Sequence, residues 1–305
     1  MYRSTPTLAH VGARLGASIY SEGGWPLLKA GRVIGPRHIQ VIQDLGYSRV
    51  VMLAPDEAAR REFVNPDIRG GIEQALAGCA NFLLECWRRP GQSPAGTGAD
   101  IEKELSARLP EFVTDVQENT SLTLPGATRS GPASWLDDAV NGAAIAVFLA
   151  QHLNMDADHR TQIAQGMLLR DIAQLTLLPG VMDHPNALSP GQGIQVQQHA
   201  QRLYHLLSTL RWGSEASRLI VLQHHERGDG SGYPQGLRAV AGAAAPTIHV
   251  LGELAAIADV FNALSMDRPH RPALTAVETR QTLDAMAGVQ LHHAMVHEQI
   301  GRAHV

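Results

Sequence analysis

The stretch at residues 223–237, QHHERGDGSGYPQGL, constrains the fold of this chain more than any other part of its sequence. An apolar run with helical spacing at 216–222 leads into two adjacent histidines, His224 and His225. Neutral imidazole is the commonest metal ligand in proteins, and the glycines and proline that follow bend the backbone into a turn. A histidine pair alone would be read as a solvated helix end, whereas the whole stretch indicates a metal site where a helix meets a loop.

This stretch resembles the signature of the HD-GYP family, metal-dependent phosphodiesterases of bacterial cyclic di-GMP signalling within the wider HD superfamily. The match is long and nearly unbroken. The resemblance implies a helical catalytic domain that binds divalent metal and cyclic di-GMP. The loop part of the signature is carried by Asp229, Gly230, Gly232, Tyr233 and Pro234.

The expected fold class is mainly α, with a C-terminal all-α HD-type helical bundle preceded by a small α+β N-terminal module. In the module, the residue patterns predict strands at 13–20, 26–29 and 49–53 around a helix at 36–46. Farther along, helical patterns separated by short loops are expected at 135–153, 162–175, 191–210, 216–225, 248–264 and from residue 276 onward.

Two breaks rich in proline and glycine, at 90–98 and 125–132, divide the chain. They predict three units: a small α+β N-terminal module at 1–65, a helical linker region at 66–130 and an HD-GYP domain at 131–305. The first unit resembles the module that precedes many HD-GYP domains. Its sequence contains no cluster of ligand residues, so we interpret it as a structural or dimerising cap, and a homodimer stays open.

Composition limits the partners that this chain can have. A net charge of −4 and a hydrophobic content of 44% describe an ordered globular protein without a basic face for nucleic acid. The first residues lack the apolar stretch of a signal peptide, and no segment has the roughly 18 apolar residues of a membrane span. A cytoplasmic location without nucleic-acid or membrane partners is expected. Residues 300–305 match the in-frame translation of a common sequencing adapter, so the natural C-terminus is expected to differ there.

The resemblance also implies which residues form the metal site. The ligand positions that this chain retains are Asp171, His199, His224, His225 and Asp259. Two arginines after Asp259, namely Arg268 and Arg271, stand where the family binds phosphate oxygens.

Three positions depart from the family pattern. Arg170 occupies the place of the histidine in the His-Asp pair, and Gln174 that of a lysine that contacts substrate phosphate. Asp138 stands where an earlier histidine ligand would be. A guanidinium cannot deprotonate, and a unit charge about 4 Å from a dication costs roughly 8 kcal/mol at an effective dielectric of about 20. We therefore expect one divalent ion (Fe, Mn or Zn) rather than two, with Asp138 a replacement ligand only if Arg170 swings away.

Two hypotheses describe Arg170 itself. In the first, Arg170 is a tethered cation that replaces the missing metal and neutralises Asp171, Asp138 and Asp259. In the second, the side chain extends to solvent after the site decayed. The sequence leaves both open.

Two functions follow from these residues. We favour a degenerate HD-GYP domain with weak or absent hydrolysis, which retains binding of nucleotide and metal or docks a partner such as a diguanylate cyclase domain. The alternative is an active phosphodiesterase that converts cyclic di-GMP to pGpG or GMP. An enzyme for another phosphoester fits the Gly-Tyr-Pro loop less well.

Overall fold

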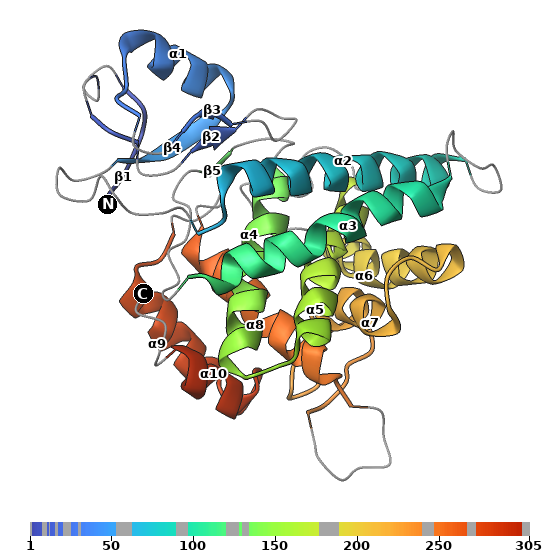
Figure 1. Ribbon diagram of the computed structural model, residues 1–305. Coiled ribbons are helices and arrows are strands. Elements are labelled where there is room, and N and C mark those ends of the chain that lie inside the picture. The colour runs from blue at the N-terminus through green and yellow to red at the C-terminus, as the bar shows by residue number, and fades with distance from the viewer. Residues whose placement is uncertain are drawn as a thin grey trace.

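The structure is a computed structural model, and it describes most of the chain. The described residues are 2–7, 11, 13–15, 18–20, 26–29, 32–52, 63–89, 97–119, 128–129, 134–176, 189–239, 247–266 and 273–300. Figure 1 shows a small N-terminal module beside a larger body of helices.

The N-terminal module combines short antiparallel strands with one helix. Strand β4 (Tyr47–Met52) lies between β1 (Tyr2–Ser4) and β5 (Thr128–Arg129), and β2 (Ile19–Tyr20) pairs with β3 (Pro26–Leu28). Helix α1 (Pro36–Asp44) begins at a proline, which lacks the N–H that a first helical residue leaves unbonded. Apolar side chains from these elements form a core of their own. Among the described residues of the strand expected at 13–20, only β2 is a strand, and Arg14 forms an isolated bridge to Val33.

The larger body consists of helices joined by loops. In the chain order they are α2 (Pro66–Arg88), α3 (Gly98–Gln117), α4 (Ser134–His152), α5 (Ala157–Leu169), the 3-10 helix η2 (Ile172–Thr176), α6 (Pro190–Leu210), α7 (Glu215–Gln223), α8 (Val250–Ser265), α9 (Ala276–Met286) and α10 (His293–Ile300).

Polar side chains begin several of these helices. Asn65 accepts a hydrogen bond from the backbone N–H of Asp67 at the start of α2, and Ser214 accepts one from Ser217 at the start of α7. Asp156 does the same for His159 at the start of α5. Each cap satisfies a backbone donor that has no partner inside its helix, which explains why the helices begin where they do.

One continuous hydrophobic core runs through the helical body. It includes side chains of α2 and α3 as well as those of α4 to α10. A buried ion-pair network adds to it: Arg69 on α2 lies 2.9 Å from Glu73 and 2.8 Å from Asp137 on α4. Arg69 also donates to Asn141 at 2.8 Å. The helices of 66–130 thus pack as part of the body, while the boundaries 1–65, 66–130 and 131–305 stay a proposal.

Two expected helices differ from those of the structure. The helix expected at 162–175 begins earlier, at Ala157, and its α-helical part ends at Leu169, so that Arg170 and Asp171 lie in the turn before η2. The helix expected from residue 276 onward is divided into α9 and α10, with Gly288 at φ +78° between them. Glycine adopts this left-handed conformation without steric cost. No helix in the described ranges has the length and apolarity needed to cross a bilayer.

Candidate metal centre

Four side chains converge in the middle of the helical body. One ligand atom each from Asp171, His199, His224 and His225 lies within 4.8 Å of the others. Asp171 follows α5, His199 lies on α6, and the two adjacent histidines follow the last residue of α7. His199 and His224 are almost completely buried. Residues far apart in sequence therefore form one compact donor set of nitrogen and oxygen.

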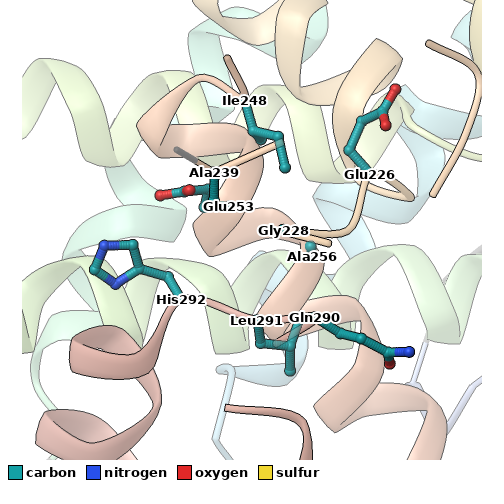
Figure 2. A pocket seen from close by; sticks show the side chains of 9 residues that line it. All are labelled: Glu226, Gly228, Ala239, Ile248, Glu253, Ala256, Gln290, Leu291 and His292. Carbon is teal, nitrogen blue, oxygen red and sulfur yellow. The ribbon is translucent and has the colours of Figure 1, made fainter. Parts of the chain in front are cut away.

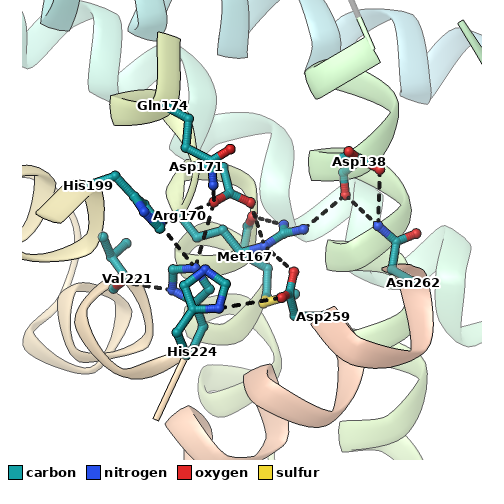
Figure 3. Close-up of polar contacts among 11 residues, drawn as sticks. Asp138, Met167, Arg170, Asp171, Gln174, His199, Val221, His224, Asp259 and Asn262 are labelled. Atoms are coloured by element: carbon teal, nitrogen blue, oxygen red, sulfur yellow. Dashed lines mark hydrogen bonds and ion pairs between the residues drawn. The ribbon is translucent and has the colours of Figure 1, made fainter. Parts of the chain in front are cut away.

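Backbone carbonyls orient two of these imidazoles. Nδ1 of His199 lies 2.5 Å from the carbonyl of Val196. Nδ1 of His224 lies 2.9 Å from the carbonyl of Val221, as Figure 3 shows. A carbonyl only accepts, so both Nδ1 atoms carry hydrogen, and in the neutral form of each ring the lone pair is on Nε2. These Nε2 atoms lie 3.5 Å apart. When both rings are neutral, two lone pairs face the same space, an arrangement that fits a metal ion.

Asp171 supplies the charged member of the cluster. Its Oδ1 lies 3.3 Å from Nε2 of His199 and 3.7 Å from Nε2 of His224. Burial alone would raise the pKa of Asp171, but the Arg170 guanidinium and the hydrogen bonds of both histidines outweigh burial and hold this pKa well below its usual range. Asp171 is therefore an anion, which is the form that binds metal.

The histidines of the cluster differ in their protonation. Burial disfavours the charged form of His199, but the hydrogen bond and the charge of Asp171 outweigh it and raise the pKa of His199. Burial and the nearby His224 instead lower the pKa of His225 well below its usual range. His225 is therefore neutral at pH 7, and its ring lies 4.6 Å from that of Tyr233, centroid to centroid.

Arg170 lies on the opposite side of Asp171 and is only 1% exposed. Its Nε is 3.1 Å from Oδ2 of Asp171 and 3.1 Å from Oδ1 of Asp259 on α8. The side chain therefore does not extend to solvent, which rules out the second hypothesis for Arg170. Figure 3 shows its guanidinium between Asp171 and Asp138.

Asp138 and Asp259 lie next to the guanidinium rather than within the four-residue cluster. The backbone carbonyl of Asp138 accepts a hydrogen bond from Nη2 of Arg170 at 3.3 Å. The side-chain Oδ1 of Asp138 lies 3.4 Å from the amide nitrogen of Asn262. Oδ2 of Asp259 lies 3.9 Å from Nδ1 of His225. Metal ligation by Asp138 or Asp259 stays a prediction, and for Asp138 it requires Arg170 to move.

The signature loop is closed by a buried carboxylate. Glu226 is 1% exposed and accepts from the backbone N–H of Gln235 at 2.7 Å and of Leu237 at 2.9 Å. Gly232 has no room for a side chain, because a Cβ there would lie 2.3 Å from the backbone nitrogen of Arg227. The loop is thereby folded back against the end of α7, with Tyr233 held beside His225.

The rest of the loop is a set of tight turns. Oδ1 of Asp229 accepts from both the backbone and the hydroxyl of Ser231, at 2.8 and 2.6 Å. Gly230 adopts φ +82°, and the Tyr233–Pro234 peptide bond is cis. Burial and the carboxylates of Asp171 and Asp259 raise the pKa of Tyr233, so its hydroxyl keeps its proton.

The family assignment follows from a comparison with known proteins. A model of the family described as HD domain matches residues 103–293, more than half of the chain. The chain belongs to the HD domain family. Its signature loop identifies it as an HD-GYP protein within that family, with a changed His-Asp pair at Arg170 and Asp171.

Curated relatives of this HD-GYP chain are phosphodiesterases of cyclic dinucleotides. The cyclic di-GMP phosphodiesterase response regulator RpfG of Xanthomonas campestris is 30% identical over 72% of this chain and 55% of its own length. A cyclic di-GMP phosphodiesterase of Pseudomonas aeruginosa is 30% identical over 59% of this chain and 41% of its own length. The 3'3'-cGAMP-specific phosphodiesterase 3 of Vibrio cholerae is 30% identical over 41% of this chain and 26% of its own length. The chain thus spans about half, or less, of the length of these relatives.

A solved structure has the same fold. An HDG"Y"P protein from Bdellovibrio bacteriovorus aligns with 98% of this chain and 99% of its own chain, at a TM-score of 0.56 and 13% identity. This likeness concerns the fold alone. The expected fold class, mainly α with an HD-type bundle and a small α+β module, is confirmed.

The three residues at the positions of expected phosphate contacts have different outcomes. Gln174 donates its amide to Oδ1 of Asp171 across a short contact, so it touches the metal-site carboxylate. Arg268 and Arg271 lie outside the described residues, and their phosphate-binding role stays a prediction.

Sequence reasoning missed several residues around the HD-GYP site. Asn262 lies three residues after Asp259 and hence on the same face of α8, where its amide donates to the Asp138 carbonyl at 3.3 Å. The spacing from Asp259 could have identified Asn262 from the sequence.

A small hollow between the loop and α8 was also missed. Burial raises the pKa of Glu253, which lies in the wall of this hollow. Figure 2 shows its lining, which shares no residue with the metal cluster: Glu226, Gly228, Ala239, Ile248, Glu253, Ala256, Gln290, Leu291 and His292.

Proposed function

We propose that this chain is a cyclic di-GMP signalling protein of the HD-GYP type whose domain binds the nucleotide through one divalent ion and hydrolyses it weakly or not at all. The proposal rests on one observation. The donors Asp171, His199 and His224 are arranged for metal, while Arg170 lies between the two carboxylates that a second ion would need.

The single-ion site has a chemically suitable donor set. Imidazole nitrogen and carboxylate oxygen together suit Fe, Mn or Zn. We assign the ion to Asp171, His199, His224 and His225. A bound divalent ion supplies Lewis acidity for phosphoryl oxygens and lowers the pKa of bound water. The chain's own part is to orient the rings of His199 and His224 through their carbonyl contacts, so that Nε2 of each faces the site, and to keep Asp171 ionised.

The remainder of the site argues against efficient hydrolysis. A two-metal phosphodiesterase stabilises both the attacking and the leaving oxygen with its ions. Arg170 supplies one fixed positive charge in this region, but a guanidinium cannot lower the pKa of a water molecule as a metal does. Gln174 is neutral where the family resemblance implies a lysine, and loss of one donor to a developing charge typically costs about 100- to 1,000-fold in rate.

Nucleotide binding needs fewer groups than hydrolysis does. A single ion can bind a phosphate oxygen, and we assign Arg268 and Arg271 to further phosphate oxygens because forked donors suit them. Docking of a diguanylate cyclase domain at the signature loop is a compatible further role. The active phosphodiesterase remains the second candidate, because four potential metal ligands lie together.

Calorimetric titration with cyclic di-GMP, followed by chromatography of the ligand, tests the proposal. We expect binding to the manganese-loaded protein, at least tenfold weaker binding after chelation, and ligand recovered intact. The variant His224→Ala should behave as the chelated protein does, and His293→Ala, at an exposed position, should behave as the wild type. Formation of pGpG or GMP at many turnovers would establish the second candidate instead. No binding of cyclic di-GMP or of 3'3'-cGAMP would refute nucleotide recognition.

A further inference from the structure

Gly142, in the interior of α4, packs directly against the guanidinium of Arg170. A Cβ at this position would lie 2.9 Å from Nη2, 3.0 Å from Nη1 and 3.2 Å from Cζ of Arg170. Glycine is the least favourable helix residue apart from proline, so its presence here needs a reason. Gly142 is four residues after Asp138 and hence on the same face of the helix. The missing side chain leaves the space that the guanidinium fills.

The guanidinium is fixed in that space by its other contacts. Nη1 donates to the carbonyl of Met167 at 2.7 Å, in the last turn of α5, and Nη2 donates to the carbonyl of Asp138 at 3.3 Å. Nε lies between carboxylate oxygens of Asp171 and Asp259, 3.1 Å from each. Because oxygens surround it on these sides and it is buried, Arg170 cannot simply move away from an added methyl group.

We propose that Arg170 and Gly142 together form a built-in cation site, in which the guanidinium permanently takes the place of a second metal ion between Asp171 and Asp259. A metal ion bonded to both carboxylates would have to lie about 2.0–2.2 Å from their oxygens, in the space that Nε occupies. This inference depends on the proposed function in one respect only, namely that Asp171 is also a ligand of the single ion. The positive charge at this place therefore belongs to the covalently attached guanidinium of Arg170, which a chelator cannot remove as it would a metal ion.

Thermal unfolding of the chelated protein in a double-mutant cycle tests the pairing. Gly142→Ala should lower Tm by about 3 °C or more in the wild type, because the methyl group displaces the guanidinium. In an Arg170→His background the shorter side chain frees the space, so the same change should leave Tm unchanged or raise it. Gly78→Ala is the matched control, since Gly78 lies inside α2 with nothing near its Cβ direction, and it should leave Tm unchanged or raise it in both backgrounds.

Equal effects of Gly142→Ala in the two backgrounds would overturn the pairing. If Arg170→His does not fold, Arg170→Lys replaces it in the cycle. Lysine keeps the charge but lacks the fork that faces Gly142, so the sign of the expected difference is the same.

Metal content tests the exclusion of the second ion without any nucleotide. Each protein is equilibrated with excess Mn²⁺, desalted and analysed for metal per chain. We expect one ion more for the double variant Arg170→His, Asp138→His than for the wild type, and no increase for Asp138→His alone. An increase with Arg170 still present, or none in the double variant, would overturn the inference. Failure of cyclic di-GMP binding would leave both readouts unaffected, so the two proposals fail separately.

Discussion

At the scale of single residues, protons and metal compete for the same nitrogens. His199 has a raised pKa because Asp171 outweighs its burial, whereas the pKa of His225 is lowered by burial and by His224. Protonated imidazole has no lone pair to offer, so the two histidines respond differently to pH. His225 is ready to ligate over the whole neutral range, while His199 must first lose its proton.

Metal affinity should therefore fall as the pH falls through the raised pKa of His199. Below that pKa the metal must displace a proton, and each further pH unit should weaken binding by about tenfold. Titration calorimetry with Mn²⁺ between about pH 5.5 and pH 7.5 measures this dependence, because an ordinary histidine already titrates in this range. The variant His293→Gln, changed at an exposed histidine, should give the same profile. Affinity that does not change over this range would contradict the assignment of His199 as a ligand.

The cluster could be anticipated residue by residue, but the conformation of Arg170 could not. The signature stretch identifies His224 and His225, and family spacing identifies Asp171 and His199. Whether Arg170 turns inward depends on the space at Gly142, which lies on another helix. The sequence alone does not predict that this glycine in an alanine-rich helix leaves room for Arg170, because that depends on which side chain packs against it in the fold.

At the scale of elements, the signature loop depends on Glu226. Glu226→Gln replaces one accepting oxygen by an NH₂ group, so the backbone N–H of Gln235 or of Leu237 loses its acceptor. A buried donor left without an acceptor costs about 1–3 kcal/mol. Hydrogen exchange at these two amides should accelerate by about tenfold or more.

Asp229→Asn is the control for this loop. An asparagine oxygen still accepts from the backbone N–H of Ser231 in an exposed turn, so exchange at residues 235 and 237 should stay close to that of the wild type. Unchanged exchange in Glu226→Gln would show that the loop is closed by other contacts.

Element boundaries were less predictable than element types. The helix at 162–175 was expected to continue through Asp171, since its apolar spacing does. In the structure the α-helix ends at Leu169, and Arg170 donates to the carbonyl of Met167 in the last turn. This tertiary arrangement, in which a side chain caps its own helix while facing two carboxylates, has no local sequence signal.

At the scale of the whole molecule, α2 and α3 belong to the same packed body as the later helices. Their apolar side chains lie in one core with those of α4 to α10, and Arg69 connects α2 to Asp137 and Asn141 on α4. The proline- and glycine-rich break at 125–132 looks like a domain boundary in sequence, but composition does not reveal what the preceding helices pack against.

Two fragments test this arrangement. A fragment of residues 63–305 should unfold in one cooperative transition, whereas one of residues 131–305 should not. The shorter fragment exposes the core that α2 and α3 cover and removes Arg69 from Asp137, and loss of one partner of a buried ion pair alone costs about 3–5 kcal/mol of a stability near 5–15 kcal/mol. Circular dichroism on heating distinguishes the outcomes. A cooperative transition in the shorter fragment would support 131–305 as an independent domain.

The measurement that tests the central claim most directly is the metal content of the wild-type protein, purified without oxygen and assayed with cyclic di-GMP in iron and in manganese. The account predicts one ion per chain and no appreciable formation of pGpG or GMP, because Arg170 occupies the place of the second ion. Two ions per chain together with turnover would contradict it, and would mean that Arg170 moves aside and that Asp138 serves as a ligand.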